Sequence, residues 1–275
     1  MPLFKHDGLE FYYQENGEGI PFIFQHGLGG DVSQPFGLFS PPSGIRLLAF
    51  DCRAHGQTRP LGNIERIHLS IFADDLGVFM DHLGINSAVI GGTSMGAAIT
   101  LNFTLRFPDR VLGLVQSRAA WLDSPNEQNA RVFAEMARLI RQMGPEAGLE
   151  QFKLSENYLE IERQSMESAK SLEGQFAHPR AAETVVKLEQ IPLDAPCSSR
   201  QEWKKIRVPT LILANHQDPI HPFEFGKVLA ESIPGAEFRE LTSKAVDVKR
   251  HGEDVQKFLN EFFAVYFLPK ELKHA

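Results

Sequence analysis

The sequence predicts an α/β fold in which a mostly parallel sheet carries helices on both faces. Short apolar segments typical of buried strands, such as 87–90 and 209–214, alternate with segments whose apolar residues recur at helical spacing. Strands joined by helices run parallel, and ligands of such sheets bind at the carboxyl ends of the strands. Polar or glycine-rich segments follow several of these strands, so a site is expected at that edge of the sheet.

The predicted elements follow one another through most of the chain. Gly8 and Gly17-Glu18-Gly19 separate two short strands that enter the sheet in antiparallel orientation. Ser70 is predicted to cap the next helix, and Gly84 to end it. In chain order the predicted elements are strands over 21–25 and 44–50, a helix over 71–83, a strand over 87–90, a helix over 97–103, strands over 110–115 and 209–214, a helix over 223–233, a strand over 236–241 and a final helix over 255–263.

The segment from Trp121 to Arg200 interrupts this alternation. It contains helical patterns such as 130–140, separated by Gly144-Pro145 and His178-Pro179, and it contains no clear strand. We therefore predict a core formed by residues 1–120 and 201–275, with a helical cap at 121–200 that covers the site.

Residues Gly92–Gly96 place a serine between glycines at a turn from strand to helix. A turn this sharp forces Ser94 into a strained conformation, and the chain packs so closely that only glycine fits two positions before and after it. The strain holds the hydroxyl exposed at the mouth of the sheet, which is a nucleophile elbow. Taken alone, the pentapeptide is equally compatible with an ordinary structural turn.

An acid and a histidine follow in the order that serine hydrolysis requires. Asp218 lies in a polar loop after strand 209–214, and His251 lies on the loop before the final helix. A serine hydroxyl needs a base to take its proton, a role we assign to His251. The imidazolium then needs a fixed anion, which Asp218 can supply. Upstream, His26–Gly30 is a glycine-rich turn suited to aim backbone N–H groups into a cavity.

With these motifs in order, the chain resembles the α/β-hydrolases of the single-domain esterase, lactonase and C–C hydrolase type over about residues 4–267. The motifs that carry the resemblance are His26–Gly30, Asp51–Thr58, Gly92–Gly96 and the segments of Asp218 and His251. Ala54, Thr93 and Arg250 replace the glycine, histidine and glycine that are usual there. The resemblance implies an eight-stranded sheet and an oxyanion hole formed by the backbone amides of Leu28 and Met95.

Several assignments have structural alternatives. Asp218 could cap the helix near Pro222, and Asp123 is the acid in some relatives. His216 and His221 lie beside Asp218 and compete with His251, but only His251 has the family position before the final helix. The family roles of His26 and His55 are structural, and Asp51 and Arg53 resemble a turn-stabilising pair.

The substrate pocket is less defined by the sequence. Arg118, just past a predicted strand, could hold a substrate carboxylate bidentately, or could pair with an acid of the cap. Trp121 and Phe133 could line an apolar pocket or belong to the core. As a hypothesis, the substrate is small and moderately hydrophobic.

A serine nucleophile excludes the dehalogenase and epoxide hydrolase branches of the family, which place aspartate at the elbow. Leu28 stands where cofactor-free haloperoxidases have tryptophan. The resemblance then implies a serine hydrolase of an ester, thioester or lactone, without metal or organic cofactor. A C–C bond hydrolase acting on a vinylogous diketone and a ligand receptor with this fold are the alternatives.

Composition agrees with a globular enzyme. Among 275 residues, 43% are hydrophobic and 23% charged. The 28 basic and 35 acidic side chains give a net charge of −7, which argues against nucleic-acid or anionic membrane partners. Cys52 and Cys197 lack a C-x-x-C spacing and suggest reduced thiols. No signal peptide or membrane-spanning run is visible, so we expect a cytoplasmic enzyme that acts on a small molecule. The sequence leaves its oligomeric state open, with a homodimer as one option.

Overall fold

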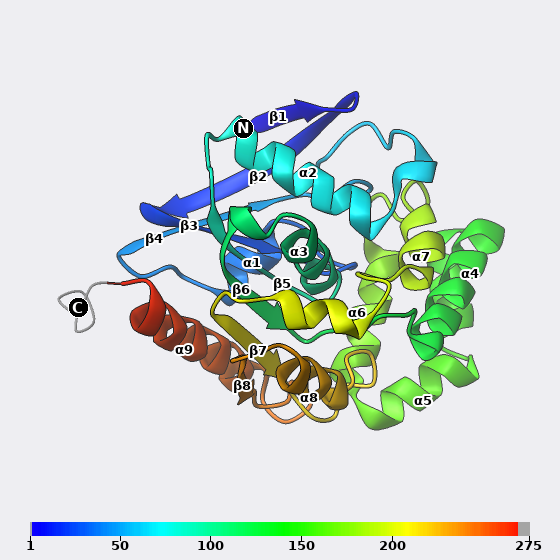
Figure 1. The fold of residues 1–275 in the computed structure, drawn as a ribbon. Helices are drawn as coiled ribbons and strands as arrows, with labels where there is room; N and C mark the ends of the chain where they lie inside the picture. The colour runs from blue at the N-terminus through cyan, green and yellow to red at the C-terminus, as the bar shows by residue number, and fades with distance from the viewer. Residues whose placement is uncertain (1, 269–275) are drawn as a thin grey trace.

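The computed structural model describes residues 2–268, which form one eight-stranded sheet surrounded by helices (Figure 1). The strands are β1 (Leu3–His6), β2 (Leu9–Gly17), β3 (Gly19–Gln25), β4 (Gly44–Phe50), β5 (Ala88–Thr93), β6 (Val111–Ser117), β7 (Thr210–Ala214) and β8 (Glu237–Glu240). They lie in the order β1-β2-β4-β3-β5-β6-β7-β8. The pairs β1–β2 and β2–β4 are antiparallel and all others are parallel, which confirms the predicted fold class and antiparallel entry.

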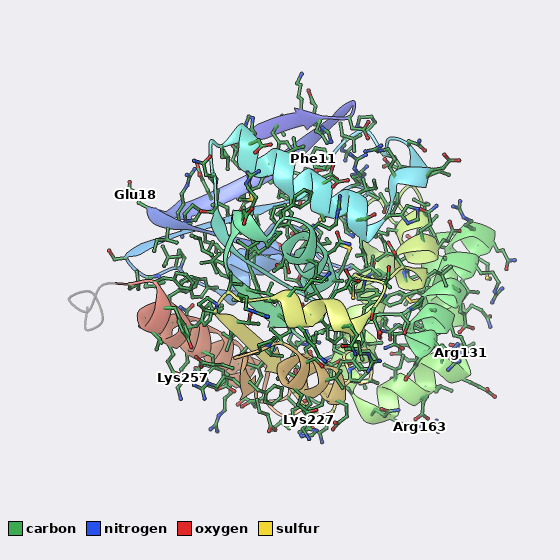
Figure 2. The ribbon with its side chains drawn as sticks, in the orientation of Figure 1. Phe11, Glu18, Arg131, Arg163, Lys227 and Lys257 are labelled. Atoms are coloured by element: carbon green, nitrogen blue, oxygen red, sulfur yellow. The ribbon has the colours of Figure 1, made fainter. Side chains whose placement is uncertain are left out.

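Helices cover both faces of this sheet because its strands are apolar on both sides. Leu47 packs on one face with α9 (Val248–Tyr266), next to α1 (Ser33–Leu38). The adjacent Leu48 packs on the other face, with α2 (Leu69–His82), α3 (Met95–Arg106) and α8 (Phe223–Ser232). Neighbouring residues of a strand point to opposite faces, so one strand serves two apolar layers. Charged side chains such as Lys227 and Lys257 lie at the surface, whereas Phe11 is buried (Figure 2).

Between β6 and β7 the chain forms helices and no strand. These are α4 (Glu127–Phe152), α5 (Glu156–Gln164), α6 (Met166–Ala177) and α7 (Val186–Gln190), and α4, α5 and α7 gather at one end of the molecule (Figure 1). Gly144 interrupts α4 with φ 78° and ψ 169°, just before Pro145. Short 3-10 turns occur at Ile64–Arg66, Pro108–Arg110, Ile191–Leu193 and Arg200–Lys205.

Two predicted helix starts are wrong. Helix α2 begins at Leu69 after His68 without a side-chain cap, so Ser70 lies inside it. Helix α9 begins at Val248, because the side chain of Asp247 accepts a hydrogen bond from the Arg250 N–H and caps it. His251 therefore lies in the first turn of α9, on its buried side, and not on the preceding loop.

The structure also bears on the expectations about membrane segments and cysteines. Within residues 2–268, no helix is both long and apolar enough to cross a membrane. Cys52 is buried, Cys197 is half-buried, and both are free thiols.

Candidate active site

Ser94 lies between β5 and α3 in the strained conformation that the sequence predicts, with φ 56° and ψ −115°. Its N–H donates to the carbonyl of Ser117 at 3.0 Å. A Cβ at Gly92 would overlap the backbone of Gly96, and one at Gly96 would overlap the backbone of Gln25. Only glycine fits at both positions, so the sharp turn at Ser94 is confirmed.

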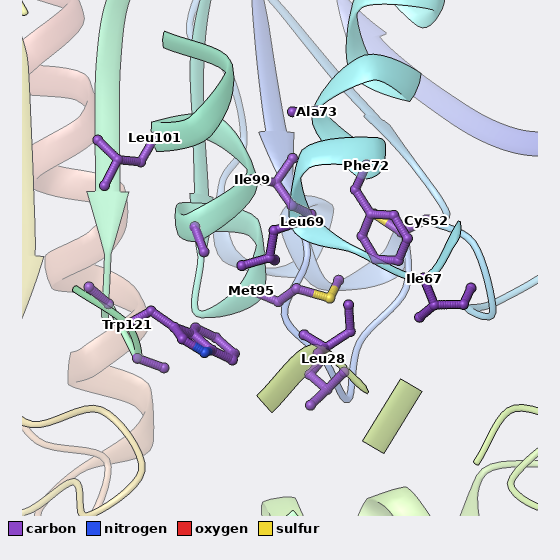
Figure 3. Close-up of a cluster of buried hydrophobic side chains, with 14 of the residues drawn as sticks. Leu28, Cys52, Ile67, Leu69, Phe72, Ala73, Met95, Ile99, Leu101 and Trp121 are labelled. Carbon is purple, nitrogen blue, oxygen red and sulfur yellow. The ribbon is translucent and has the colours of Figure 1, made fainter. Parts of the chain in front are cut away.

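Two backbone amides beside Ser94 donate no hydrogen bond to any of residues 2–268. Met95 is the first residue of α3, so its N–H has no acceptor within the helix. The Leu28 N–H donates no hydrogen bond to any residue in the range 2–268. The side chains of Leu28 and Met95 are buried in one apolar cluster with Trp121 (Figure 3), which holds both turns in place. These amides are the donors that an oxyanion hole requires.

His26, in the glycine-rich turn 26–30, and His55 contact backbone atoms, as expected for structural residues. Nδ1 of His26 lies 2.8 Å from the Gly27 carbonyl, and its Nε2 accepts from the Cys52 N–H at 3.1 Å. Nε2 of His55 lies 3.0 Å from the carbonyl of Leu28. Burial lowers the pKa of His26 to about 4, which keeps its ring neutral.

Asp51 and Arg53 do stabilise turns, but not as a pair with each other. Asp51 accepts hydrogen bonds from the N–H groups of Val32 and Gln57, at 2.8 and 2.6 Å. Arg53 is buried and pairs with Asp75 at 2.7 Å. Each side chain thus connects a different pair of segments.

Ser94 lies in the wall of a cavity of about 90 Å³, to which α4 and α6 also contribute residues. Its wall includes Leu28, Phe133 from α4, Leu172 from α6, and Ile220 and His221 from the loop after β7. Phe133, a candidate pocket residue from the sequence, lies in this wall. Trp121 is buried in the cluster with Leu28 and is not part of this wall, and its indole N–H has no partner within residues 2–268.

Asp218 forms a buried cluster with Arg118 and His221. Its Oδ2 accepts from Nε and Nη2 of Arg118 at 2.9 and 2.6 Å, and Nδ1 of His221 lies 2.9 Å from Oδ1. Nη2 of Arg118 lies 3.0 Å from the same Nδ1. We assign the proton of His221 to Nδ1, because the carboxylate of Asp218 only accepts and is the nearer group, and this tautomer leaves Nε2 free to accept. Burial opposes the charge of Asp218, but His221 and Arg118 hold its pKa well below the usual value. Asp218 does not cap α8, whose N-cap is Pro222.

His251 is oriented by a backbone carbonyl. Its Nδ1 lies 2.8 Å from the carbonyl oxygen of Thr242, so Nδ1 carries the proton and Nε2 can accept one. Within residues 2–268, His251 makes no hydrogen bond with Asp218 or Ser94. Burial, followed by the charge of Arg118, lowers its pKa to about 4. The structure thus joins Asp218 to His221 and Arg118, and leaves His251 on a different acceptor.

The other candidates lie outside this cluster. Asp123 pairs with Arg200 at 2.7 Å. His216 is exposed and stacks on Phe223, with ring centroids 3.6 Å apart. No group of three or more histidine, cysteine or acidic residues within 2–268 is arranged to hold a metal ion.

Sequence reasoning missed two residues near the nucleophile. Gln34 in α1 accepts from the Gly27 N–H at 2.7 Å and lies in the wall of the Ser94 cavity. Lys244 follows β8 and lies in the wall of a second cavity beside it. Gln34 had a usable signal, because it comes just after the glycine-rich turn at 26–30. Lys244 had none, since a lysine in a loop is usually solvated.

Comparisons with known proteins give relatives with different substrates. A family model described as alpha/beta hydrolase fold matches residues 20–245. A putative carbamate hydrolase, RutD, from Azorhizobium caulinodans is 26% identical over 251 residues, 88% of this chain and 89% of its own. The enol-lactonase from Burkholderia xenovorans LB400 has a TM-score of 0.73 at 23% identity, covering 96% and 100% of the two chains. A meta-cleavage product hydrolase from Pseudomonas fluorescens IP01 has a TM-score of 0.67 at 23% identity, covering 95% and 98%.

Proposed function

Because this chain belongs to the alpha/beta hydrolase fold family, we propose that it is a serine hydrolase of a small, moderately hydrophobic ester, thioester or lactone. The observation that carries the proposal is Ser94 at a strained elbow, in the wall of a cavity and beside the amides of Leu28 and Met95, which donate no hydrogen bond within residues 2–268. With Cys52 and Cys197 as free thiols, we also propose the reducing cytoplasm as its compartment.

The proposed reaction passes through an acyl-enzyme. The Ser94 oxygen attacks the substrate carbonyl carbon while a base takes its proton, and the carbonyl electrons move to the oxygen. The amides of Leu28 and Met95 stabilise this oxyanion. Because the backbone fixes both N–H groups before the charge develops, they lower the energy of the transition state without having to reorient. The base then gives its proton to the leaving alcohol, and water releases the acid from Ser94 by the same steps.

Two imidazoles meet the chemical requirements of the base, and they differ in what orients them. We assign the role to His221, because it contacts Asp218 and lines the cavity of Ser94. His251, the base expected from the sequence, is the second candidate, with Thr242 as its orienting group. The triad of Ser94, Asp218 and His251 would require the Nδ1–H of His251 to leave the Thr242 carbonyl for Asp218, which Arg118 and His221 already contact.

The relatives do not decide the bond that is cleaved, since their names include a carbamate hydrolase, an enol-lactonase and a meta-cleavage product hydrolase. The test is labelling by a fluorophosphonate, with the modified peptide identified by mass spectrometry, followed by turnover of esters, thioesters, lactones and dienones. We expect label on Ser94 and fastest turnover of an ester, thioester or lactone. Preference for the dienone would instead assign C–C hydrolysis, and label without any turnover would assign a receptor.

Phe133→Ala is expected to shift the acyl-chain preference. Removing the ring enlarges the wall of the Ser94 cavity, so kcat/KM for a long-chain 4-nitrophenyl ester should rise relative to a short-chain one. Such a truncation also costs about 3–5 kcal/mol of stability, which a thermal melt measures. Phe152→Ala is the matched control, because Phe152 is buried in α4 but is not part of that wall. An equal shift in both variants would show that Phe133 does not shape the pocket.

A further inference from the structure

A second cavity, of about 270 Å³, adjoins the cavity of Ser94. The two share Gln34, Arg118 and Ser171 in their walls, so one molecule can extend from one into the other. The rest of the second wall comes from the beginnings of α6 and α9 and from the loops after β7 and β8. Polar side chains dominate it, whereas the first wall also includes the apolar side chains of Leu28, Phe133 and Leu172.

The charged groups around the second cavity do not balance. They are three cations and two carboxylates: Arg118, Lys170, Lys244, Glu167 and Asp218. Arg118 pairs with Asp218 at 2.6 Å, and Lys170 with Glu167 at 2.7 Å. Lys244 makes no hydrogen bond or ion pair with any residue of the described chain, 2–268. One positive charge therefore remains without a counter-ion.

The ammonium of Lys244 is in a costly position when the cavity holds no anion. The side chain is half-buried, and burial together with the charge of Arg118 lowers its pKa to about 8. It is still largely protonated at neutral pH, so an anion beside it gains a charge-assisted hydrogen bond.

We propose that this second cavity binds a free carboxylate of the substrate through Lys244, so that the enzyme acts on esters or lactones that carry an additional carboxylate. The inference rests on the proposed hydrolase function. A single excess charge matches a carboxylate, whereas a phosphate monoester would bring about −1.5 to −2 charges into the same space. Arg118 is bound to Asp218 through Nε and Nη2, which leaves Nη1 as its one nitrogen without a hydrogen bond in the described part of the chain.

The test compares 4-nitrophenyl hydrogen glutarate with the neutral 4-nitrophenyl pentanoate. The wild-type enzyme should prefer the anionic ester. Lys244→Met should lower kcat/KM for that ester about 10- to 100-fold, the range for a hydrogen bond to a charged group, and leave the neutral ester almost unchanged. Lys244→Arg should retain most of the preference. Lys170→Met is the control, because Lys170 borders the same cavity but is paired with Glu167.

A binding measurement separates this inference from the hydrolase proposal. Monomethyl glutarate, titrated calorimetrically into the wild type and into Lys244→Met, reports the carboxylate site even in a protein that turns over no ester. We expect binding to the wild type, with clear weakening in the variant, and no such difference for neutral dimethyl glutarate. Two results would overturn the assignment. One is that Lys244→Met binds monomethyl glutarate as tightly as the wild type does, and the other is that this variant loses activity equally towards 4-nitrophenyl hydrogen glutarate and 4-nitrophenyl pentanoate.

Discussion

Ser94→Ala is expected to reduce ester turnover to near the uncatalysed rate. Removing the nucleophile of a serine hydrolase costs about 10⁴-fold or more in kcat, and only the residual effect of binding and the oxyanion donors remains. Alanine and serine both carry a Cβ, so the backbone strain at φ 56° is the same for both, and the fold should tolerate the change. The measurement is kcat for a 4-nitrophenyl ester, with a thermal melt to show that the variant is folded.

Ser171→Ala is the matched control for this prediction. Ser171 also lies in the wall of the Ser94 cavity, but on α6 and without strained backbone. Its loss should change kcat only several-fold and leave fluorophosphonate labelling intact. If Ser94→Ala retained more than about a tenth of the activity, a covalent step on this serine would be ruled out.

The fold and the elbow could be predicted because they depend on local rules. The alternation of strands and helices follows from apolar periodicity, and it placed both ends of every parallel strand to within two residues, except the end of β5. The turn at Ser94 needs glycine at positions 92 and 96, since backbone packs directly against both. Both kinds of information lie within a few neighbouring residues.

The partners of the acid could not be predicted in the same way. Arg118 reaches Asp218 from a position 100 residues earlier in the chain, and only the pairing of β6 with β7 brings the two together. His221 is near Asp218 in sequence, but family position favoured His251. Asp247 then starts α9 earlier than expected, and the Thr242 carbonyl becomes the acceptor for His251. Long-range packing and one helix cap decide these contacts.

His221→Gln is expected to be the most damaging single change after loss of the nucleophile. A positioned general base contributes roughly 10²–10⁴-fold, so kcat for a neutral ester should fall by that factor. His251→Gln is the matched control, because each variant loses one imidazole at a site with little solvent exposure near Arg118, Asp218 and Lys244. We expect it to cost less than about tenfold. The reverse order of effects would assign the base to His251, oriented by Thr242.

The pH dependence gives a second check on this assignment. Only a neutral imidazole accepts the proton of Ser94, so kcat/KM falls as the pH drops through the pKa of the base. Burial is the largest influence on His221 and lowers its pKa below the ordinary 6.5, although Asp218 opposes it. The acid limb of the profile for a neutral ester should therefore have its midpoint below pH 6.5. In Asp218→Asn the opposing charge is lost, so the pKa of His221 falls further and the acid limb moves to still lower pH. A limb that moved upward in Asp218→Asn would mean that Asp218 does not act on the base as a carboxylate.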